Sequence, residues 1–297
     1  MTVQADTLLI DGHNLLFRYF QGMPRTLISP DGTLFHGAYG AIAGILSHIK
    51  QFQPRNVIVC FDTPYRTQRS LLLETYKANR PQFAPDDPEN PFTQLPFLQK
   101  ALQLLNIYTI EMPGVEADDL IGSYAQLART RNQRVMIIST DRDLMQLVDP
   151  TTHIYVRRGK KELFYTPELV AETFGVTPAQ FIDFKALVGD TSDNIRGVPG
   201  IGPKTAASLL QTFGTLETLY ANLAQVKPRL AAKLREHEEL VILNKQIVTI
   251  DCQVAVESSW IEQPQTIVPL SARDIFAQLG FFSRMGRDPG DIPVSAD

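Results

Sequence analysis

Three stretches of the chain share one pattern, a short run of apolar and β-branched residues that ends in aspartate. They read TLLID at 7–11, NVIVCFD at 56–62 and RVMIISTDRD at 134–143. Apolar runs without alternation are typical of strands that are buried on both faces, as in a parallel sheet. The pattern therefore predicts three parallel strands, each followed by an acid at its carboxyl end.

Apolar residues at helical spacing lie between these runs, at 41–49 and at 120–128. Strands that alternate with helices indicate an α/β fold, in which a central, mostly parallel sheet carries helices on both faces. In such sheets, sites form at the carboxyl ends of the strands. That edge is therefore the expected place for a functional site.

The chain changes character at about residue 166, where helical patterns replace the strands. Capping and stop signals predict helices at 177–188, 205–213 and 228–248. After Arg284 the sequence becomes rich in Pro, Gly and Asp, which is typical of a mobile end. The predicted organisation is an α/β core over 1–165, a helical part over 166–284 and a mobile tail over 285–297.

The segment 63–95 fits neither pattern. Its first half, TPYRTQRSLLLETYKANR, is basic with helical character, and its second half, PQFAPDDPENPF, is polar and rich in proline. A connection of this length is usually functional or disordered. Lys77 and Arg80 are three residues apart, so on a helix they would share one face above the carboxyl edge. The other interpretation of this pair is an ordinary solvated helix face.

Composition sets limits on the class of protein. The chain has 297 residues, of which 44% are hydrophobic and 20% charged, as in a globular protein with a full core. It has two cysteines, its first strand is expected at Thr7, and no apolar stretch has the ~18 residues that span a membrane. We therefore expect a cytoplasmic protein without a membrane partner. The net charge of −4 disfavours nucleic-acid binding unless many acids gather at one place.

Acids do gather at the predicted carboxyl edge and just beyond it. Each one could serve only as a helix cap or a turn residue. Together they need cations, because two unpaired carboxylates about 4 Å apart repel by roughly 4 kcal/mol at an effective dielectric near 20. No arginines are clustered beside them in the sequence, and His13 is the only histidine nearby, which disfavours zinc. Ligand sets made of oxygen favour Mg²⁺ or Mn²⁺ and two-metal phosphodiester hydrolysis. The candidate ligands are Asp11, Asp62, Glu116, Asp118, Asp119, Asp141, Asp143, Asp190 and Asp193.

The stretch GDTSDNIRGVPGIGPKT at 189–205 joins two of these acids to a glycine-rich turn that leads into a helix. Bare backbone N–H groups and a helix N-terminus both attract phosphate. One interpretation is a loop that holds an outer metal with its acids and a duplex phosphate with its glycines and Lys204. The other is a packing corner whose glycines serve only the turn.

Six stretches in order resemble the 5′-3′ exonuclease/flap endonuclease family, in the bacterial type that also forms the N-terminal domain of DNA polymerase I. They read LLIDGHNLLFR, VIVCFD, YKANRP, GVEADDLIGSYA, STDRDLMQLV and LVGDTSDNIRGVPGIGPKTA. The resemblance runs from about residue 8 to 284. It implies a PIN-like sheet with helices on both faces, a helical arch at about 63–95 and a helix–three-turn–helix motif at about 186–214.

The resemblance also implies roles for single residues. The first metal cluster would be Asp11, Asp62, Glu116, Asp118, Asp119 and Asp141, and the second Asp143, Asp190 and Asp193. The basic positions that bind phosphate would be Arg18, Lys77, Arg80, Lys185 and Lys204, with Lys77, Arg80 and Arg18 acting in catalysis. The remaining DNA-binding positions would be Tyr39, Arg69, Gly197, Gly200, Gly202 and Thr205. Tyr39 would stack on a terminal base, although core packing is the commoner fate of a tyrosine in a helix. Gln68 departs from the aromatic residue that the family often has there, so strand threading through the arch is expected to differ.

The predicted function is a structure-selective 5′ nuclease that hydrolyses DNA with metal-activated water at 5′ ends and 5′ flaps beside duplex. The resemblance implies two or more Mg²⁺ ions, Mn²⁺ as a substitute, and K⁺ at the turn formed by residues 197–202. It also implies RNA-primed ends among the substrates, a role in replication and repair, and a monomer in the bacterial nucleoid. Met1 and the family-like end of the chain favour a free-standing protein. The alternatives are a PIN-like nuclease acting on RNA, which the glycine turn disfavours, and a non-catalytic flap-binding protein, which nine intact acids disfavour.

Overall fold

A six-stranded sheet forms the centre of the molecule in a computed structural model that describes residues 4–85, 87–159 and 161–282. The strand order is β3-β2-β1-β4-β5-β6. All neighbours are parallel except β6, which runs antiparallel to β5. The strands are β1 Thr7–Asp11, β2 Asn56–Cys60, β3 Tyr108–Ile110, β4 Val135–Ile138, β5 Thr152–Arg158 and β6 Lys161–Tyr165. This confirms the predicted α/β fold with a mostly parallel sheet.

The three predicted strands are β1, β2 and β4, and they are adjacent. Asp11 lies opposite Cys60 of β2, and Ile10 lies opposite Ile138 of β4. The carboxyl ends of the three strands are therefore level. This register brings the acids that end or follow each strand to one edge, as the sequence predicted.

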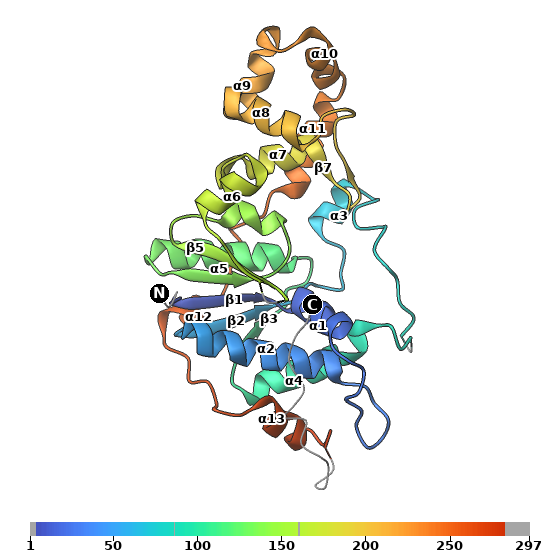
Figure 1. Ribbon diagram of the computed structural model, residues 1–297, viewed down its shortest axis with the longest axis vertical. Helices are drawn as coiled ribbons and strands as arrows, with labels where there is room; N and C mark the ends of the chain where they lie inside the picture. Colours follow the sequence, from blue (N-terminus) through green and yellow to red (C-terminus); the bar gives the residue numbers. More distant parts are fainter. Residues whose placement is uncertain (1–3, 86, 160, 283–297) are drawn as a thin grey trace.

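Helices cover both faces of the sheet (Figure 1). Leu8 and Ile10 are buried in the core that contains α1, α2, α4 and α13, whereas Leu9 is buried in the core that contains α5 and α7. This alternation follows from the strand, whose successive side chains point to opposite faces. The helices named here are α1 Gly12–Gly22, α2 His36–Phe52, α4 Leu95–Leu104, α5 Ala117–Thr130, α7 Phe181–Val188 and α13 Ala272–Gln278.

The part of the chain from α6 to α11 is helical and extends away from the sheet, at the top of Figure 1, and the chain then returns to the sheet with α12 and α13. The predicted helices at 177–188 and 205–213 are confirmed, and the one at 228–248 is interrupted at His237. A two-residue hairpin, β7 with β8, lies between α7 and α8. The remaining elements are α6 Pro167–Phe174, β7 Gly189–Asp190, β8 Ile195–Arg196, α8 Pro203–Phe213, α9 Leu216–Ala221, α10 Pro228–Glu236, α11 Glu238–Val248 and α12 Ser259–Glu262, with 3-10 turns η1 Pro91–Gln94, η2 Asp143–Leu147, η3 Pro178–Gln180 and η4 Leu223–Gln225.

The segment 63–95 contains one short α-helix, α3 Gln68–Leu72, before η1. Residues 74–79 form turns, and Lys77 has a positive φ of 56°. The expected helix that would present Lys77 and Arg80 on one face is therefore wrong, because the backbone turns between them. Figure 1 shows the segment as an open trace along one side of the molecule, from α3 down to α4.

Two other predictions are not decided by the fold. The predicted boundary at 165/166 falls between β6 and α6 and stays a prediction. The mobile tail at 285–297 lies outside the described residues. Among the described helices, none combines the length and the apolar character that crossing a membrane would require.

Candidate active site

Asp11 and Asp62 lie at the carboxyl edge of the sheet and connect it to the helices around it. Asp11 caps α1 by accepting from the backbone N–H of Asn14 (3.0 Å), and its other oxygen accepts from the Ser139 hydroxyl (3.0 Å). Asp62 accepts from the backbone N–H of Ala117 at the start of α5 (2.9 Å). Burial and the nearby charge of Asp62 raise the pKa of Asp11 to about 7.

His13 contacts Asp62, a role that the sequence did not indicate. The backbone N–H of Asp62 donates to His13 Nδ1 (3.1 Å), and this nitrogen lies 3.5 Å from Asp62 Oδ2. Burial would raise the pKa of Asp62, but the bond to His13 and the charge of Lys77 outweigh it and lower that pKa. Asp62 is therefore held as a carboxylate.

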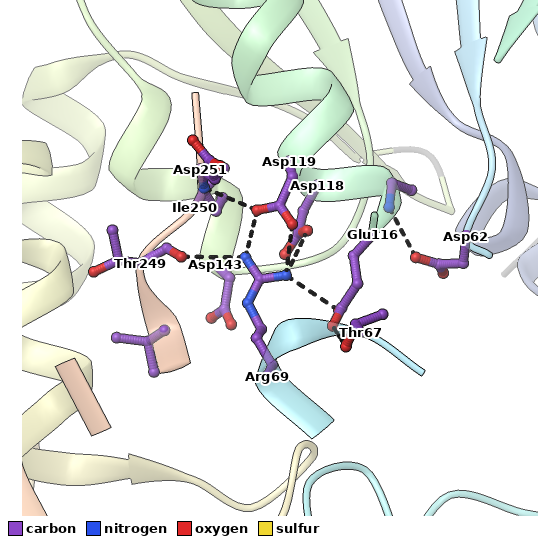
Figure 2. Close-up of polar contacts among 12 residues, drawn as sticks. Asp62, Thr67, Arg69, Glu116, Asp118, Asp119, Asp143, Thr249, Ile250 and Asp251 are labelled. Carbon is purple, nitrogen blue, oxygen red and sulfur yellow. Dashed lines mark hydrogen bonds and ion pairs between the residues drawn. The ribbon is translucent and has the colours of Figure 1, made fainter. Parts of the chain in front are cut away.

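Arg69 of α3 lies among the acids at the start of α5 (Figure 2). Its Nη1 donates to Asp118 Oδ1 and to Asp119 Oδ2, both at 3.1 Å, and its Nη2 donates to Asp119 Oδ1 at 2.6 Å. Glu116 lies 3.4 Å from Nη1. Only 7% of Arg69 is exposed. The sequence showed no arginine cluster beside these acids, but the fold brings Arg69 to them, buried and not on a surface where DNA would meet it.

Glu116 is surrounded by donors from the segment 63–95. It accepts from the Thr67 hydroxyl (2.7 Å), the Tyr76 hydroxyl (3.1 Å) and the Lys77 ammonium (2.5 Å). The charges of Lys77 and Arg69 keep the pKa of Glu116 low even though burial acts to raise it. Thr67 and Tyr76 were missed in the sequence, where only their closeness to Arg69 and Lys77 could have pointed to them.

The second group of acids is also paired with basic side chains. Lys185 of α7 lies between Asp143, at 2.5 Å, and Asp190, with which it is also in ion-pair contact. Asp193 accepts from Arg80 Nη2 (2.7 Å). Lys185 is buried, so the structure places this predicted phosphate ligand inside the acid group. Asp190 also closes a turn by accepting from the backbone N–H of Ser192 (2.7 Å).

Hydrogen bonds connect the two groups into one site, which we call the acid edge. The Ser139 hydroxyl donates to Asp11 and accepts from the backbone N–H of Asp141 (3.1 Å), and Asp141 accepts from the backbone N–H of Asp143 (2.9 Å). The acid edge consists of all nine predicted ligands, Asp11, Asp62, Glu116, Asp118, Asp119, Asp141, Asp143, Asp190 and Asp193.

The side chains of the acid edge are not arranged around a common point. Within the described ranges, no three His, Cys, Asp or Glu side chains converge closely enough to form a metal site. Their oxygens fit a hard divalent cation by chemistry. By geometry six of them pair with Arg69, Lys77, Arg80 or Lys185, so these carboxylates must turn to bind a cation; the six are Glu116, Asp118, Asp119, Asp143, Asp190 and Asp193.

A groove of about 1060 Å³ leads from the acid edge to the N-terminus of α8. Asn14 lines it from α1, Thr140 and Asp141 from the loop after β4, and Asp190 and Lys204 from the helical part. Arg142 also lines the groove, where it is exposed, and in the described part of the chain it forms no ion pair. Sequence reasoning did not single out Arg142, although it stands between two predicted ligands.

The glycine turn, residues 197–202, comes directly before Pro203 and Lys204, which line this groove. A Cβ on Gly197 would lie 2.1 Å from the carbonyl oxygen of Val188, and Gly200 has a φ of +79°, so the fold itself requires both glycines. A Cβ on Gly202 would have no other heavy atom within 4 Å. Lys204 is exposed and has no ion pair among the described residues, and Thr205 follows it half-buried in the first turn of α8. The Lys233 ammonium donates to the carbonyl of Pro199 (2.8 Å).

Two further predicted residues, Arg18 for catalysis and Tyr39 for base stacking, contact parts of the fold other than the nine acids. Arg18 donates to the carbonyl of Arg157 in β5. Tyr39 is partly buried against Phe35 and Phe276 in the core under the sheet. The structure therefore favours core packing for Tyr39 over the stacking role that the resemblance implied.

Comparison with known proteins decides the family. A family model described as 5′-3′ exonuclease, N-terminal resolvase-like domain, matches residues 6–175. A second, described as 5′-3′ exonuclease, C-terminal SAM fold, matches residues 176–266. The chain belongs to the 5′-3′ exonuclease family. The resemblance inferred from the sequence is confirmed, and nuclease activity is the activity of this family.

The chain is similar to one part of DNA polymerase I. It is 36% identical over 300 residues to the enzyme of Bacillus subtilis (strain 168), covering 98% of this chain and 33% of that protein. It is 38% identical over 257 residues to the enzyme of Bacillus caldotenax, covering 85% of this chain and 28% of that protein. The chain thus spans about a third of the length of the curated relatives it matches.

Solved structures show the same fold. The T5 D15 protein co-crystallised with metal ions superposes with a TM-score of 0.69 at 26% identity, covering 91% of this chain and 98% of that one. The catalytic core of Rad2 in complex with DNA substrate gives a TM-score of 0.58 at 15% identity, covering 94% and 88%, which is a likeness of fold.

Proposed function

We propose that this protein is a Mg²⁺-dependent, structure-selective 5′ nuclease that cuts DNA at 5′ ends and 5′ flaps beside duplex. The observation that carries the proposal is the groove that joins three carboxylates of the acid edge, Asp141, Asp190 and Asp193, to the exposed Lys204. Carboxylates suit the metals that cleave phosphodiesters, and the lysine end suits the backbone of a duplex.

The carboxylates of the acid edge would hold two or more Mg²⁺ ions, with Mn²⁺ able to substitute. Asp11, Asp62 and Asp141 come from the ends of neighbouring strands, and Asp143, Asp190 and Asp193 lie beyond them. When bound, the cations lower the pKa of water and offset negative charge on the scissile phosphate. The T5 D15 protein has been crystallised with metal ions, which supports a metal-dependent family chemistry.

Lys77 and Arg80 would act on the scissile phosphate from the segment 63–95. In the structure they rest on Glu116 and Asp193, so both cations already lie at the acid edge. A phosphate that enters would accept from them, and their charge would stabilise the negative charge that develops as water attacks. The terminal nucleotides must unpair to reach this depth, which costs a few kcal/mol and favours frayed or single-stranded 5′ ends.

The glycine turn would bind the duplex beyond the cut. Gly202 leaves the backbone open at the start of α8, where a phosphate can approach the N–H groups, and Lys204 supplies the charge. K⁺ bound to carbonyls of this turn would add to the attraction. Because Lys233 donates to Pro199, the ion would share the turn with an ammonium group.

The proposed substrates include RNA-primed 5′ ends, and the proposed role is primer removal and repair by a monomer. Structures of the T5 D15 flap endonuclease with DNA and metal ions, and of Rad2 with DNA substrate, support DNA as the substrate class.

The test is a cleavage assay on a 5′-labelled flap duplex, with Mg²⁺ and with a chelator. Cleavage near the junction that needs Mg²⁺ is expected, and a matched RNA strand without duplex should remain intact. Binding of the flap without cleavage would indicate the non-catalytic alternative. Faster cleavage of the RNA strand would indicate a nuclease of the RNA-directed kind.

A further inference from the structure

Arg69 connects three parts of the chain that are far apart in sequence (Figure 2). A guanidinium has five N–H donors, and Arg69 forms five hydrogen bonds. Three go to Asp118 and Asp119. The other two go to backbone carbonyls at the C-terminal end of α11, from Nε to Ile247 (2.9 Å) and from Nη2 to Thr249 (3.2 Å). The side chain is therefore fully satisfied while it covers the acids.

The oxygens that Arg69 covers are the ones a divalent cation would need. Both oxygens of Asp119 and one oxygen of Asp118 accept from Arg69, and Glu116 is occupied by donors from the segment 63–95. A guanidinium that holds both oxygens of Asp119 competes with a hard cation for them, because both groups carry positive charge and repel each other at this distance.

We propose that Arg69 is an internal counter-ion of the metal-free protein, which a divalent cation must displace from Asp118 and Asp119 in order to bind. The inference rests on the proposed metal site. It assigns to Arg69 control over cation affinity, in place of the DNA contact that the family resemblance implied.

The position of Arg69 allows this displacement. The helix that carries it, α3, has five residues, and its Leu71 and Leu72 are 68% and 42% exposed, so little apolar burial holds it in place. The carbonyls of Ile247 and Thr249 remain available to a guanidinium that has left the acids. Cation binding is therefore expected to loosen α3 and, with it, the start of the segment that carries Lys77 and Arg80.

Titration calorimetry with Mn²⁺, without DNA, tests the proposal on the wild type, Arg69→Gln and Arg129→Gln. Arg129 pairs with Asp149 outside the acid edge, so its variant loses a guanidinium but no competitor. If the wild type has Arg69 displaced about one-tenth of the time, Arg69→Gln will bind Mn²⁺ about tenfold more tightly. Arg129→Gln will keep the wild-type affinity. Equal or weaker binding by Arg69→Gln overturns the proposal.

Hydrogen exchange on the wild type provides a second measurement that does not depend on the variant folding. Saturating Mg²⁺ should speed exchange of the amides at 68–73 relative to the metal-free protein. Unchanged or slower exchange there, with Mg²⁺ bound, contradicts displacement while the proposed metal site survives. Failure of both the wild type and Arg69→Gln to bind any divalent cation instead removes the metal site, and the proposed function with it.

Discussion

The acid edge and the glycine turn both carry basic side chains, but these meet different partners. At the acid edge, Arg69 and Lys185 are buried against carboxylates. At the glycine turn, Lys204 is exposed and, in the part of the chain described, unpaired, while Lys233 donates to a neutral carbonyl. Among the described residues, the basic side chains of the acid edge are thus paired with carboxylates of the fold, whereas those of the glycine turn have no acidic partner. An unbalanced lysine beside bare backbone is the feature that marks a surface for an external anion.

The largest expected loss of cleavage follows substitution of Asp141, an acid-edge carboxylate with no ion pair among the described residues. Asp141→Ala should lower the cleavage rate on the order of 10³-fold, because several kcal/mol of charge stabilisation depends on the cations. Flap binding should stay within a few-fold of wild type, since the duplex contacts remain. Single-turnover cleavage rates and flap affinities test both expectations. Glu239→Ala, at an exposed acid on α11, is the control. Wild-type cleavage by Asp141→Ala would remove it from the site.

Lys77→Ala should produce the next largest effect. Loss of a cation that acts on developing charge is expected to reduce turnover about 100-fold with little change in flap affinity. Its positive φ makes alanine strained at this turn, so Lys77→Gly, which accepts that backbone, separates the lost charge from the strain. If the glycine variant turned over at the wild-type rate, the ammonium would have only the structural role of pairing with Glu116.

Alanine substitutions at two glycines of the same turn should distinguish an effect on stability from an effect on duplex binding. Gly197→Ala places a Cβ against the Val188 carbonyl and should destabilise the protein by about 3 kcal/mol. Gly202→Ala has open space and should change stability by less than about 0.5 kcal/mol, yet weaken duplex binding. Chemical denaturation measures the stability of the two variants, and a duplex-binding titration measures their affinity. A Gly202→Ala variant that binds duplex like the wild type would restrict the turn to a packing role.

The smallest effect concerns Lys204. Lys204→Ala should reduce the slope of log affinity for duplex against log salt by about one, because one phosphate contact is lost. Lys100→Ala, at an exposed lysine on α4, should leave the slope as it is. A Lys204 variant with the wild-type slope would mean that this lysine does not contact the DNA backbone.

The carboxyl edge could be predicted from sequence because Asp11, Asp62 and Asp141 each end or follow a continuous apolar run. The register of β1, β2 and β4 then fixes the three strand ends at the same level. The strands β3, β5 and β6 were not predicted. β3 has three residues, and β6, KELFY, carries charges at an edge of the sheet, where burial does not select apolar residues.

The pairing of the acids with internal cations could not be predicted. Arg69 meets Asp119, a partner 50 residues away, only because α3 and the start of α5 come together in the fold. The loss of helix around Lys77 was equally hidden, since the turn depends on backbone contacts such as the one from Lys77 N–H to the Asp193 carbonyl (3.0 Å).

At the open end of the hairpin formed by β7 and β8, two positions have no room for a side chain. A Cβ on Gly189 would lie 2.3 Å from the nitrogen of Gly197, and one on Gly197 would lie 2.8 Å from the nitrogen of Gly189. Because these two backbone segments are in direct contact, they form a spacer whose length does not change when side chains are substituted. In the proposed nuclease, this spacer lies between the acids at 190 and 193 and the duplex grip at 202–204. The backbone between these acids and residues 202–204 would then set the number of nucleotides between the duplex contact and the cut. Inserting one residue there would move the cut along the strand.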